Sequence, residues 1–181
     1  MKFNNVPNPF HYVEGKIVWE SRSIAVTGVI FIYKNLIPHV LVSRRGPKSA
    51  DYKDKMNLVA GYLDWNETGF EAFVRETWEE TGFNLLEALE TMDIIKSNTK
   101  EPWSVNSKVD ENHQNVTLRY GVCFQIGSDE QFPLLTTEHN EVVGECEDPQ
   151  WLPLEHVNEH EWAFNHDKVI EEYYNKINDI P

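Results

Sequence analysis

The sequence has 181 residues, 40% hydrophobic and 25% charged, which predicts one soluble globular domain spanning residues 1–181. Thirty acidic against sixteen basic residues give a formal net charge of −14. This charge disfavours partners with an anionic surface, so we expect no nucleic acid and no membrane as a partner. The longest apolar run, 24–33, is much shorter than the roughly 20 residues that a membrane-spanning helix needs.

Residues 1–20 lack the continuous apolar stretch of a secretory signal. The two cysteines, Cys123 and Cys146, form no CxxC motif, which argues against a disulfide framework and against a thiolate zinc site. Together these features favour a reducing, cytoplasmic location.

The first half of the chain predicts strands followed by a helix. Apolar, β-branched residues predict buried strands over 24–33 and 39–43, and 57–60 predicts a short strand that runs into Gly61. A helix is predicted over 68–82. It begins with the capping-box spacing of Thr68 and Glu71 and ends at Gly82, which suits a left-handed position.

The second half continues the alternation of strands and helices. The expected elements are a strand within 85–95, a polar loop over 96–115, a strand over 116–126 and an amphipathic helix over 162–177. Residues 136–150 are acidic and fit no element clearly. Interleaved strands and helices predict an α+β fold with a mixed sheet and helices on both sides.

The predicted helix carries two different stripes of side chains. The stripe expected to pack on the sheet consists of Phe70, Phe73, Val74 and Thr77. Glu76, Glu79 and Glu80 lie on the other, at spacing i, i+3 and i+4. Like charges at this spacing destabilise a helix by a few tenths of a kcal/mol per pair, so they are either an ordinary solvated face or ligands of a cation.

The surrounding residues favour the cation. The segment from Gly61 to Phe83 has the spacing of the Nudix box, and it matches all seven fixed positions of that motif: Gly61, Glu67, Arg75, Glu76, Glu79, Glu80 and Gly82. A chance match at one starting point is on the order of 10⁻⁸ to 10⁻⁹. The chain therefore resembles the Nudix hydrolase family, with its box at 61–83. One position departs from the pattern, because Thr77 stands where the family usually has an aliphatic residue.

The resemblance implies a Nudix-type α/β/α sandwich and a set of roles. Glu79 and Glu80 would be the principal ligands of Mg²⁺, with Mn²⁺ as an alternative. Glu76 would be a ligand or the base that activates water, and the Gly61 carbonyl would also face the metal. Arg75 would orient the glutamates, and Glu67 would support the site. Metal ions of this kind stabilise charge on a diphosphate and lower the pKa of bound water.

Further candidates lie outside the box. Family members often place another catalytic glutamate beyond the helix, and the candidates here are Glu138, Glu141, Glu145 and Glu147. We favour Glu145, because it shortly precedes residues 151–154, which resemble the closing strand of the family. Arg44 and Arg45 end the strand 39–43, where one of them could bind a substrate phosphate. The alternative for both arginines is a solvated strand end.

Three weaker signals remain. Residues 162–167 resemble a stretch near the C-terminus of ADP-ribose-type members, although Asn165 or Asp167 could equally cap a helix. Tyr62, Trp65 and Trp103 could stack on a base or simply pack. Residues 156–160 match the H-x-x-E-H pattern of zinc proteases, but the long helix and distant third ligand of that site have no counterpart here.

The sequence therefore predicts a metal-dependent hydrolase that cleaves the pyrophosphate bond of an ADP-ribose-like nucleotide, a small-molecule substrate. The alternatives are a nucleoside triphosphate pyrophosphatase and a non-catalytic module that senses a nucleotide. The intact glutamates argue against the second alternative. A homodimer is left open as the oligomeric state.

Overall fold

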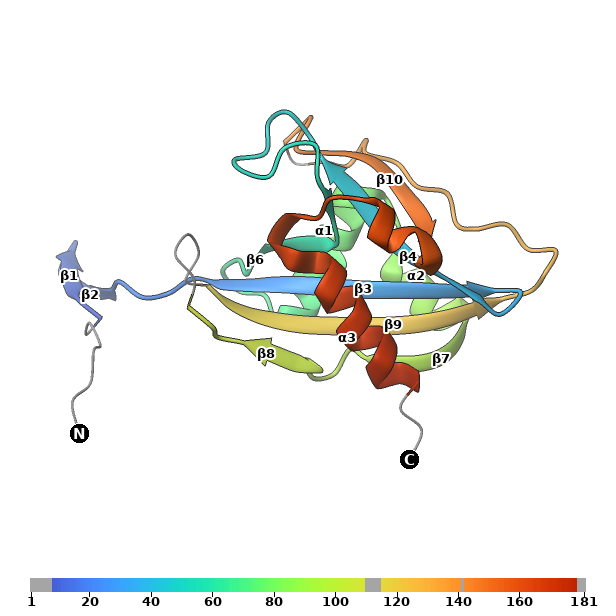
Figure 1. Cartoon of the computed structure of the whole chain (residues 1–181). Helices are drawn as coiled ribbons and strands as arrows, with labels where there is room; N and C mark the ends of the chain where they lie inside the picture. Colours follow the sequence, from blue (N-terminus) through green and yellow to red (C-terminus); the bar gives the residue numbers. More distant parts are fainter. Residues whose placement is uncertain (1–7, 110–114, 141, 179–181) are drawn as a thin grey trace, which may run out of the picture.

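The computed structural model describes residues 8–109, 115–140 and 142–178 (Figure 1). The strands are β1 Phe10–Val13, β2 Lys16–Trp19, β3 Ile24–Lys34, β4 Ile37–Arg45, β5 Met56–Asn57, β6 Val59–Tyr62, β7 Asp93–Asn98, β8 Ser104–Asn106, β9 Val116–Ile126 and β10 Cys146–Pro153. The helices are α1 Gly69–Thr81, α2 Leu85–Thr91 and α3 His166–Asn178, and two 3₁₀ helices are η1 Leu154–Glu159 and η2 Ala163–Asn165.

The main sheet has eight strands and is mixed. Its central path runs β10-β4-β3-β9-β7, while β5 pairs with β4, β6 with β3 and β8 with β9. Strands β3 and β9 are parallel over their whole length, and the other pairs are antiparallel. Strands β1 and β2 pair only with each other and form a small hairpin apart from this sheet (Figure 1).

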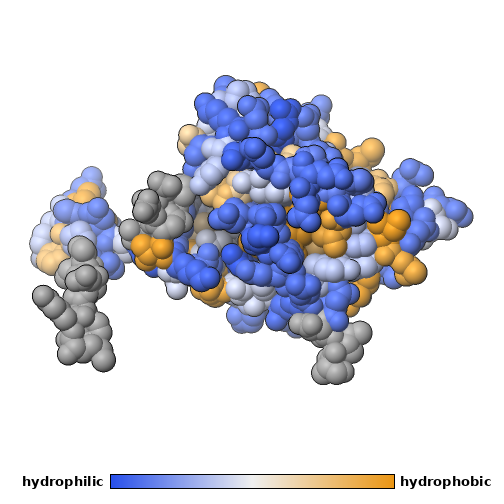
Figure 2. Space-filling model, viewed as in Figure 1, coloured by the Kyte–Doolittle hydropathy of each residue, from blue (hydrophilic) through white to orange (hydrophobic). Residues whose placement is uncertain are grey.

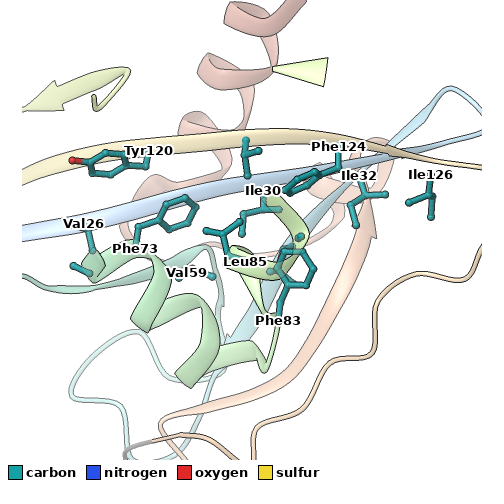
Figure 3. Close-up of a cluster of buried hydrophobic side chains, with 14 residues drawn as sticks. Val26, Ile30, Ile32, Val59, Phe73, Phe83, Leu85, Tyr120, Phe124 and Ile126 are labelled. Carbon is teal, nitrogen blue, oxygen red and sulfur yellow. The ribbon is translucent and has the colours of Figure 1, made fainter. Parts of the chain in front are cut away.

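Helices cover both faces of the sheet, which confirms the predicted α+β sandwich (Figure 1). Strand β3 shows why, because its side chains alternate between the two faces. Ile30 and Ile32 join the cluster that contains Phe73 of α1, seen in Figure 3. Phe31, on the other face, packs against Tyr173 of α3 with the rings stacked 6.2 Å apart. Figure 2 shows that the outer surface over α3 is mostly hydrophilic.

Helix α1 forms as its local sequence predicts. Thr68 and Glu71 make the reciprocal capping box, and Gly82 ends the helix with φ 67°. The buried Thr77 hydroxyl donates to the Phe73 carbonyl one turn back at 2.6 Å. That bond satisfies the one polar atom that Thr77 brings to the packing stripe, where the motif usually has an aliphatic residue.

Two predicted elements were wrong. Residues 85–91 form helix α2, not a strand, because the Asn84 side chain accepts the Glu87 N–H and so caps a helix start. The strand of this region, β7, begins only at Asp93. The predicted loop 96–115 contains the end of β7 and all of β8, a polar strand held by pairing with β9.

The predicted C-terminal helix begins later than expected. Residues 163–165 form η2, with Phe164 and Asn165 at φ 54° and 56°, and α3 begins at His166. His166 is buried, and its Nδ1 accepts the N–H of Leu58, the residue between β5 and β6, at 3.0 Å. This bond joins α3 to the strand segment that leads to Gly61.

His166 predicts a specific dependence of stability on pH. Burial, and then the charges of Arg119 and Arg45, lower the pKa of His166 from 6.5 to about 3. The folded protein therefore holds this side chain neutral where the unfolded chain protonates it. The contribution of neutral His166 to the free energy of unfolding is complete above pH 6.5. It is lost as the pH falls toward 3, by at most about 1.4 kcal/mol per pH unit.

Urea denaturation at a series of pH values tests this expectation against His166→Gln. Glutamine can still accept the Leu58 N–H but does not titrate, so the variant should lose less stability per pH unit below pH 6.5. All other titrating groups are common to both proteins and cancel in the difference. Parallel pH profiles for the two proteins would show that His166 is protonated in the folded state.

Candidate active site

The site forms where α1 crosses the end of β6. Gly61 pairs with Val26 in the sheet, and a Cβ at Gly61 would lie 1.9 Å from Glu76 Oε1. A side chain at Gly61 would therefore displace the Glu76 carboxylate from this position. The close approach places the Glu76 carboxylate of α1 against the Gly61 backbone.

Arg75 holds three of the acids together. Its Nε and Nη2 donate to the two oxygens of Glu67 at 3.0 and 2.8 Å. Its Nη1 donates to Glu76 Oε1 at 2.8 Å and to Glu79 Oε2 at 3.1 Å. The hydrogen bonds from Arg75 lower the pKa of Glu67. Glu67 thus acts here as an anchor for the guanidinium, which in turn fixes the positions of two other carboxylates.

Two of the glutamates are in an environment that disfavours their charge. Burial, opposed by Arg75, raises the pKa of Glu76 to about 7. Glu80 is only 9% exposed, and burial followed by the charge of Glu76 raises its pKa well above 4.5. The Ala60 N–H donates to Glu80 at 3.3 Å and the Cys146 thiol lies in contact with it, which partly offsets the shift. A bound divalent cation would favour the ionised forms of both carboxylates.

A cleft opens beside these residues, lined by Glu79, Glu80, Asn140, Glu145 and Cys146. Glu145 is therefore the candidate that the structure brings to the glutamates of α1. Its carbonyl accepts the Gly46 N–H and the Ser49 hydroxyl, both at 2.7 Å, which fixes the backbone at this point.

The other three candidates differ in their placement. Glu147 pairs with Arg44 at 3.3 Å, and Glu138 is exposed in the loop before the cleft. Glu141 lies outside the described residues.

Sequence reasoning missed Asn140 and Cys146 as residues of the cleft. The Asn140 side chain donates to the Cys146 carbonyl at 2.8 Å, and the Cys146 thiol is buried with a raised pKa. The loop that carries Asn140 is held against α1, where His139 stacks on Trp78 at 4.1 Å and the Thr136 N–H donates to Thr81. No local signal marked these residues, because their position depends on contacts with a distant helix.

Both arginines at the end of β4 have acidic partners. Arg44 contacts Asp148 and pairs with Glu147 at 3.3 Å and with Asp54 at 3.5 Å. Arg45 pairs with Asp51 at 2.8 Å and lies 5.1 Å above the ring of Phe164. Phosphate binding by either arginine remains a prediction, and it would require the side chain to exchange these partners.

The remaining sequence candidates are placed as follows. Phe164 packs on Tyr52 at 4.7 Å, so residues 162–167 help to hold the segment that links β4 to β5. Trp103 is a packing residue, with its ring 5.3 Å from Tyr173. Tyr62 and Trp65 are exposed.

The H-x-x-E-H stretch does not lie on a long helix. Residues 156–159 belong to the short η1, where His156 Nδ1 hydrogen-bonds Glu159 at 3.0 Å, and His160 follows its end. Among the described residues, no three histidine, cysteine, aspartate or glutamate side chains are already arranged to hold a metal ion. That statement includes the carboxylates of α1, two of which hydrogen-bond Arg75.

The donor set of α1 nevertheless fits a hard cation. Glu76, Glu79, Glu80 and the Gly61 carbonyl offer only oxygen, which suits Mg²⁺ or Mn²⁺. Burial keeps the thiol of Cys146 protonated, so it does not compete as a ligand. The raised pKa values of Glu76 and Glu80 show the cost of charge that a cation would offset.

The family model for the NUDIX domain matches residues 23–173. The chain belongs to the NUDIX family, and its mixed sheet between helices is the Nudix fold. No curated protein matched the sequence. No helix in the described part of the chain has the length and apolar character needed to span a membrane.

Solved structures share this fold at low sequence identity. The NUDIX domain of Shewanella oneidensis NrtR, complexed with ADP ribose, is 19% identical, with 87% of this chain and 90% of that chain covered and a TM-score of 0.60. A bifunctional NMN adenylyltransferase/ADP ribose pyrophosphatase from Francisella tularensis, complexed with AMP and a Mn ion, is 20% identical, with 87% and 42% covered and a TM-score of 0.64. The Nudix hydrolase RenU from M. smegmatis is 16% identical, with 96% of both chains covered and a TM-score of 0.61.

Proposed function

We propose that the protein is a divalent-metal-dependent hydrolase that cleaves the pyrophosphate bond of a nucleoside diphosphate linked to a second group, with ADP-ribose as the model substrate. The observation that carries this proposal is the placement of the α1 glutamates. Glu76 lies against Gly61 and shares Arg75 with Glu79, and Glu79 and Glu80 line a cleft that also holds Glu145. The fold shared with a pyrophosphatase and with an ADP-ribose-bound NUDIX domain supports it.

The chemistry follows from the positions of the side chains. When bound, the metal would stabilise charge on the diphosphate and lower the pKa of water. Glu76, Glu79 and Glu80 would hold it, with Arg75 fixing the first two in place. Glu145 reaches the cleft from the loop just before β10 and is exposed, so it can take the proton from the attacking water. Water adds to one phosphorus and the bridging oxygen leaves with the other, which gives AMP and ribose 5-phosphate from ADP-ribose.

Two alternatives are tested by the same experiment. The first is a nucleotide-sensing module, which would bind ADP-ribose without cleaving it. It is raised by NrtR, which has also been solved with a 27mer DNA. A triphosphate pyrophosphatase would prefer a substrate with more negative charge. On a chain of net charge −14 with Arg44 and Arg45 already paired, the added charge of a triphosphate has few cations available.

The proposed function and its two alternatives are distinguished by kcat/KM. It is measured for ADP-ribose and for the common nucleoside triphosphates, with Mg²⁺ and with Mn²⁺. We expect ADP-ribose to be cleaved faster than any triphosphate. A triphosphate preferred by tenfold or more, about 1.4 kcal/mol of transition-state stabilisation, would replace the proposed substrate class with that of a triphosphate pyrophosphatase. Tight binding of ADP-ribose without turnover would favour the sensor.

A further inference from the structure

The proposed substrate carries two phosphates into a cleft whose nearest side chains are acidic. Glu79, Glu80 and Glu145 line it, and Arg75 is already shared among three carboxylates. Metal ions offset part of this charge, but a diphosphate still gains from a cationic side chain at the rim. The two arginines at the end of β4 each have acidic partners within 3.5 Å.

Lys48 lies beside the cleft and, unlike Arg44 and Arg45, has no acidic partner among the described residues. It is exposed and makes no ion pair with any residue in the described parts of the chain. Its amino group is therefore available to a ligand without first leaving an acidic partner, in contrast to Arg44 and Arg45.

The backbone holds Lys48 next to Glu145. The Lys48 N–H donates to the Gly144 carbonyl at 3.0 Å, and on either side Gly46 N–H and the Ser49 hydroxyl donate to the Glu145 carbonyl at 2.7 Å. The segment 46–49 and the segment 144–145 therefore form one hydrogen-bonded unit. The unit fixes the backbone of Lys48 against Gly144, which directly precedes Glu145, a residue that lines the cleft.

The side chain of Lys48 passes over a position without a side chain. Its Cγ and Cδ lie 3.8 Å from the place that a Cβ at Gly144 would occupy, and Gly144 has φ 86°. The aliphatic stem thus runs beside Gly144, the residue before Glu145, and the Lys48 side chain is exposed to solvent. A lysine so held can swing its charge over the cleft at little conformational cost.

From this arrangement we infer that Lys48 is a substrate-binding residue, whose ammonium group contacts the diphosphate of the nucleotide at the rim of the cleft. The inference rests on the proposed function, since it concerns the same cleft and the same class of substrate. Lys48 binds the substrate and takes no part in transferring the proton. Its loss should therefore raise KM and leave kcat nearly unchanged.

The test is Lys48→Met, which keeps the stem over Gly144 and removes only the charge. We expect its KM for ADP-ribose to rise roughly tenfold with kcat within about threefold of wild type, and its Kd for ADP-ribose measured by calorimetry to rise in parallel. Lys48→Arg should restore most of the affinity. KM of the wild type should also rise more steeply with salt than KM of Lys48→Met, because only the wild type makes an ionic contact that salt can screen.

Lys100→Met is the matched control. Lys100 is exposed in the connection between β7 and β8, at the edge of the sheet opposite β10. Its replacement by methionine removes the same charge from the protein. If both methionine variants raise KM equally, the effect is that of net charge and the inference fails. It also fails if wild type cleaves ADP-ribose and Lys48→Met does so with unchanged KM, although the proposed function then stands. A wild-type protein that neither binds nor cleaves ADP-ribose would overturn both.

Discussion

Glu80→Gln is expected to lower kcat by more than about 100-fold, a loss of at least about 2.7 kcal/mol of transition-state stabilisation, while the protein remains folded. Glu80 is buried, and its carboxylate is proposed as a ligand of the metal. A neutral amide of nearly the same shape removes the negative charge from the site. It also removes the cost of burying that charge, so the free energy of unfolding without metal should be unchanged or higher.

Steady-state kinetics at saturating Mg²⁺, with urea denaturation in the absence of metal, measures both quantities. Glu171→Gln, the same change at an exposed position of α3, is the control and should alter neither. Retention of more than a tenth of the wild-type rate by Glu80→Gln would remove Glu80 from the proposed set of ligands.

Arg75→Gln is expected to impair both activity and stability. The guanidinium is the shared partner of Glu67, Glu76 and Glu79, and without it these carboxylates repel one another and lose their fixed positions. We expect a loss of about 1–3 kcal/mol in the free energy of unfolding and a fall of more than tenfold in kcat/KM. Mg²⁺ should restore part of the stability, because a ligand that binds only the folded state favours it.

The comparison with Glu80→Gln makes this expectation specific. One variant should lose activity without losing stability, and the other should lose both. Arg75→Lys keeps the charge but not the forked geometry, and it should be intermediate. If Arg75→Gln matches the wild type in stability and in kcat/KM, then the guanidinium does not organise the site.

The sequence predicted the elements whose signals are local. The capping box of Thr68 and Glu71 and the terminal Gly82 placed α1 to within a residue at each end. The apolar, β-branched runs placed β3 and β9, both buried in the middle of the sheet. The placement of Glu76 against Gly61 follows from its position in α1 and a single long-range contact.

The rest depends on contacts between distant segments. Residues 85–91 form a helix because Asn84 caps it and because Leu85 and Ala88 are buried against the core. In the sequence, a short apolar run does not distinguish a buried strand from a buried helix. Asn140 reaches the cleft on a loop held by Trp78 and Thr81, and Cys146 reaches it at the start of β10, opposite Arg45. The pairing of Arg45 with Asp51 likewise depends on how residues 46–55 fold back, which no spacing rule describes.

The most direct test of the proposed function is the formation of AMP and ribose 5-phosphate from ADP-ribose as a function of added Mg²⁺, starting from metal-chelated protein. The proposed metal role of Glu76, Glu79 and Glu80 predicts no product without the metal, and the two products in equal amounts once it is added. Product formation that is unaffected by chelation would contradict the metal role of these glutamates. Absence of product at every Mg²⁺ concentration would contradict the proposed hydrolysis itself.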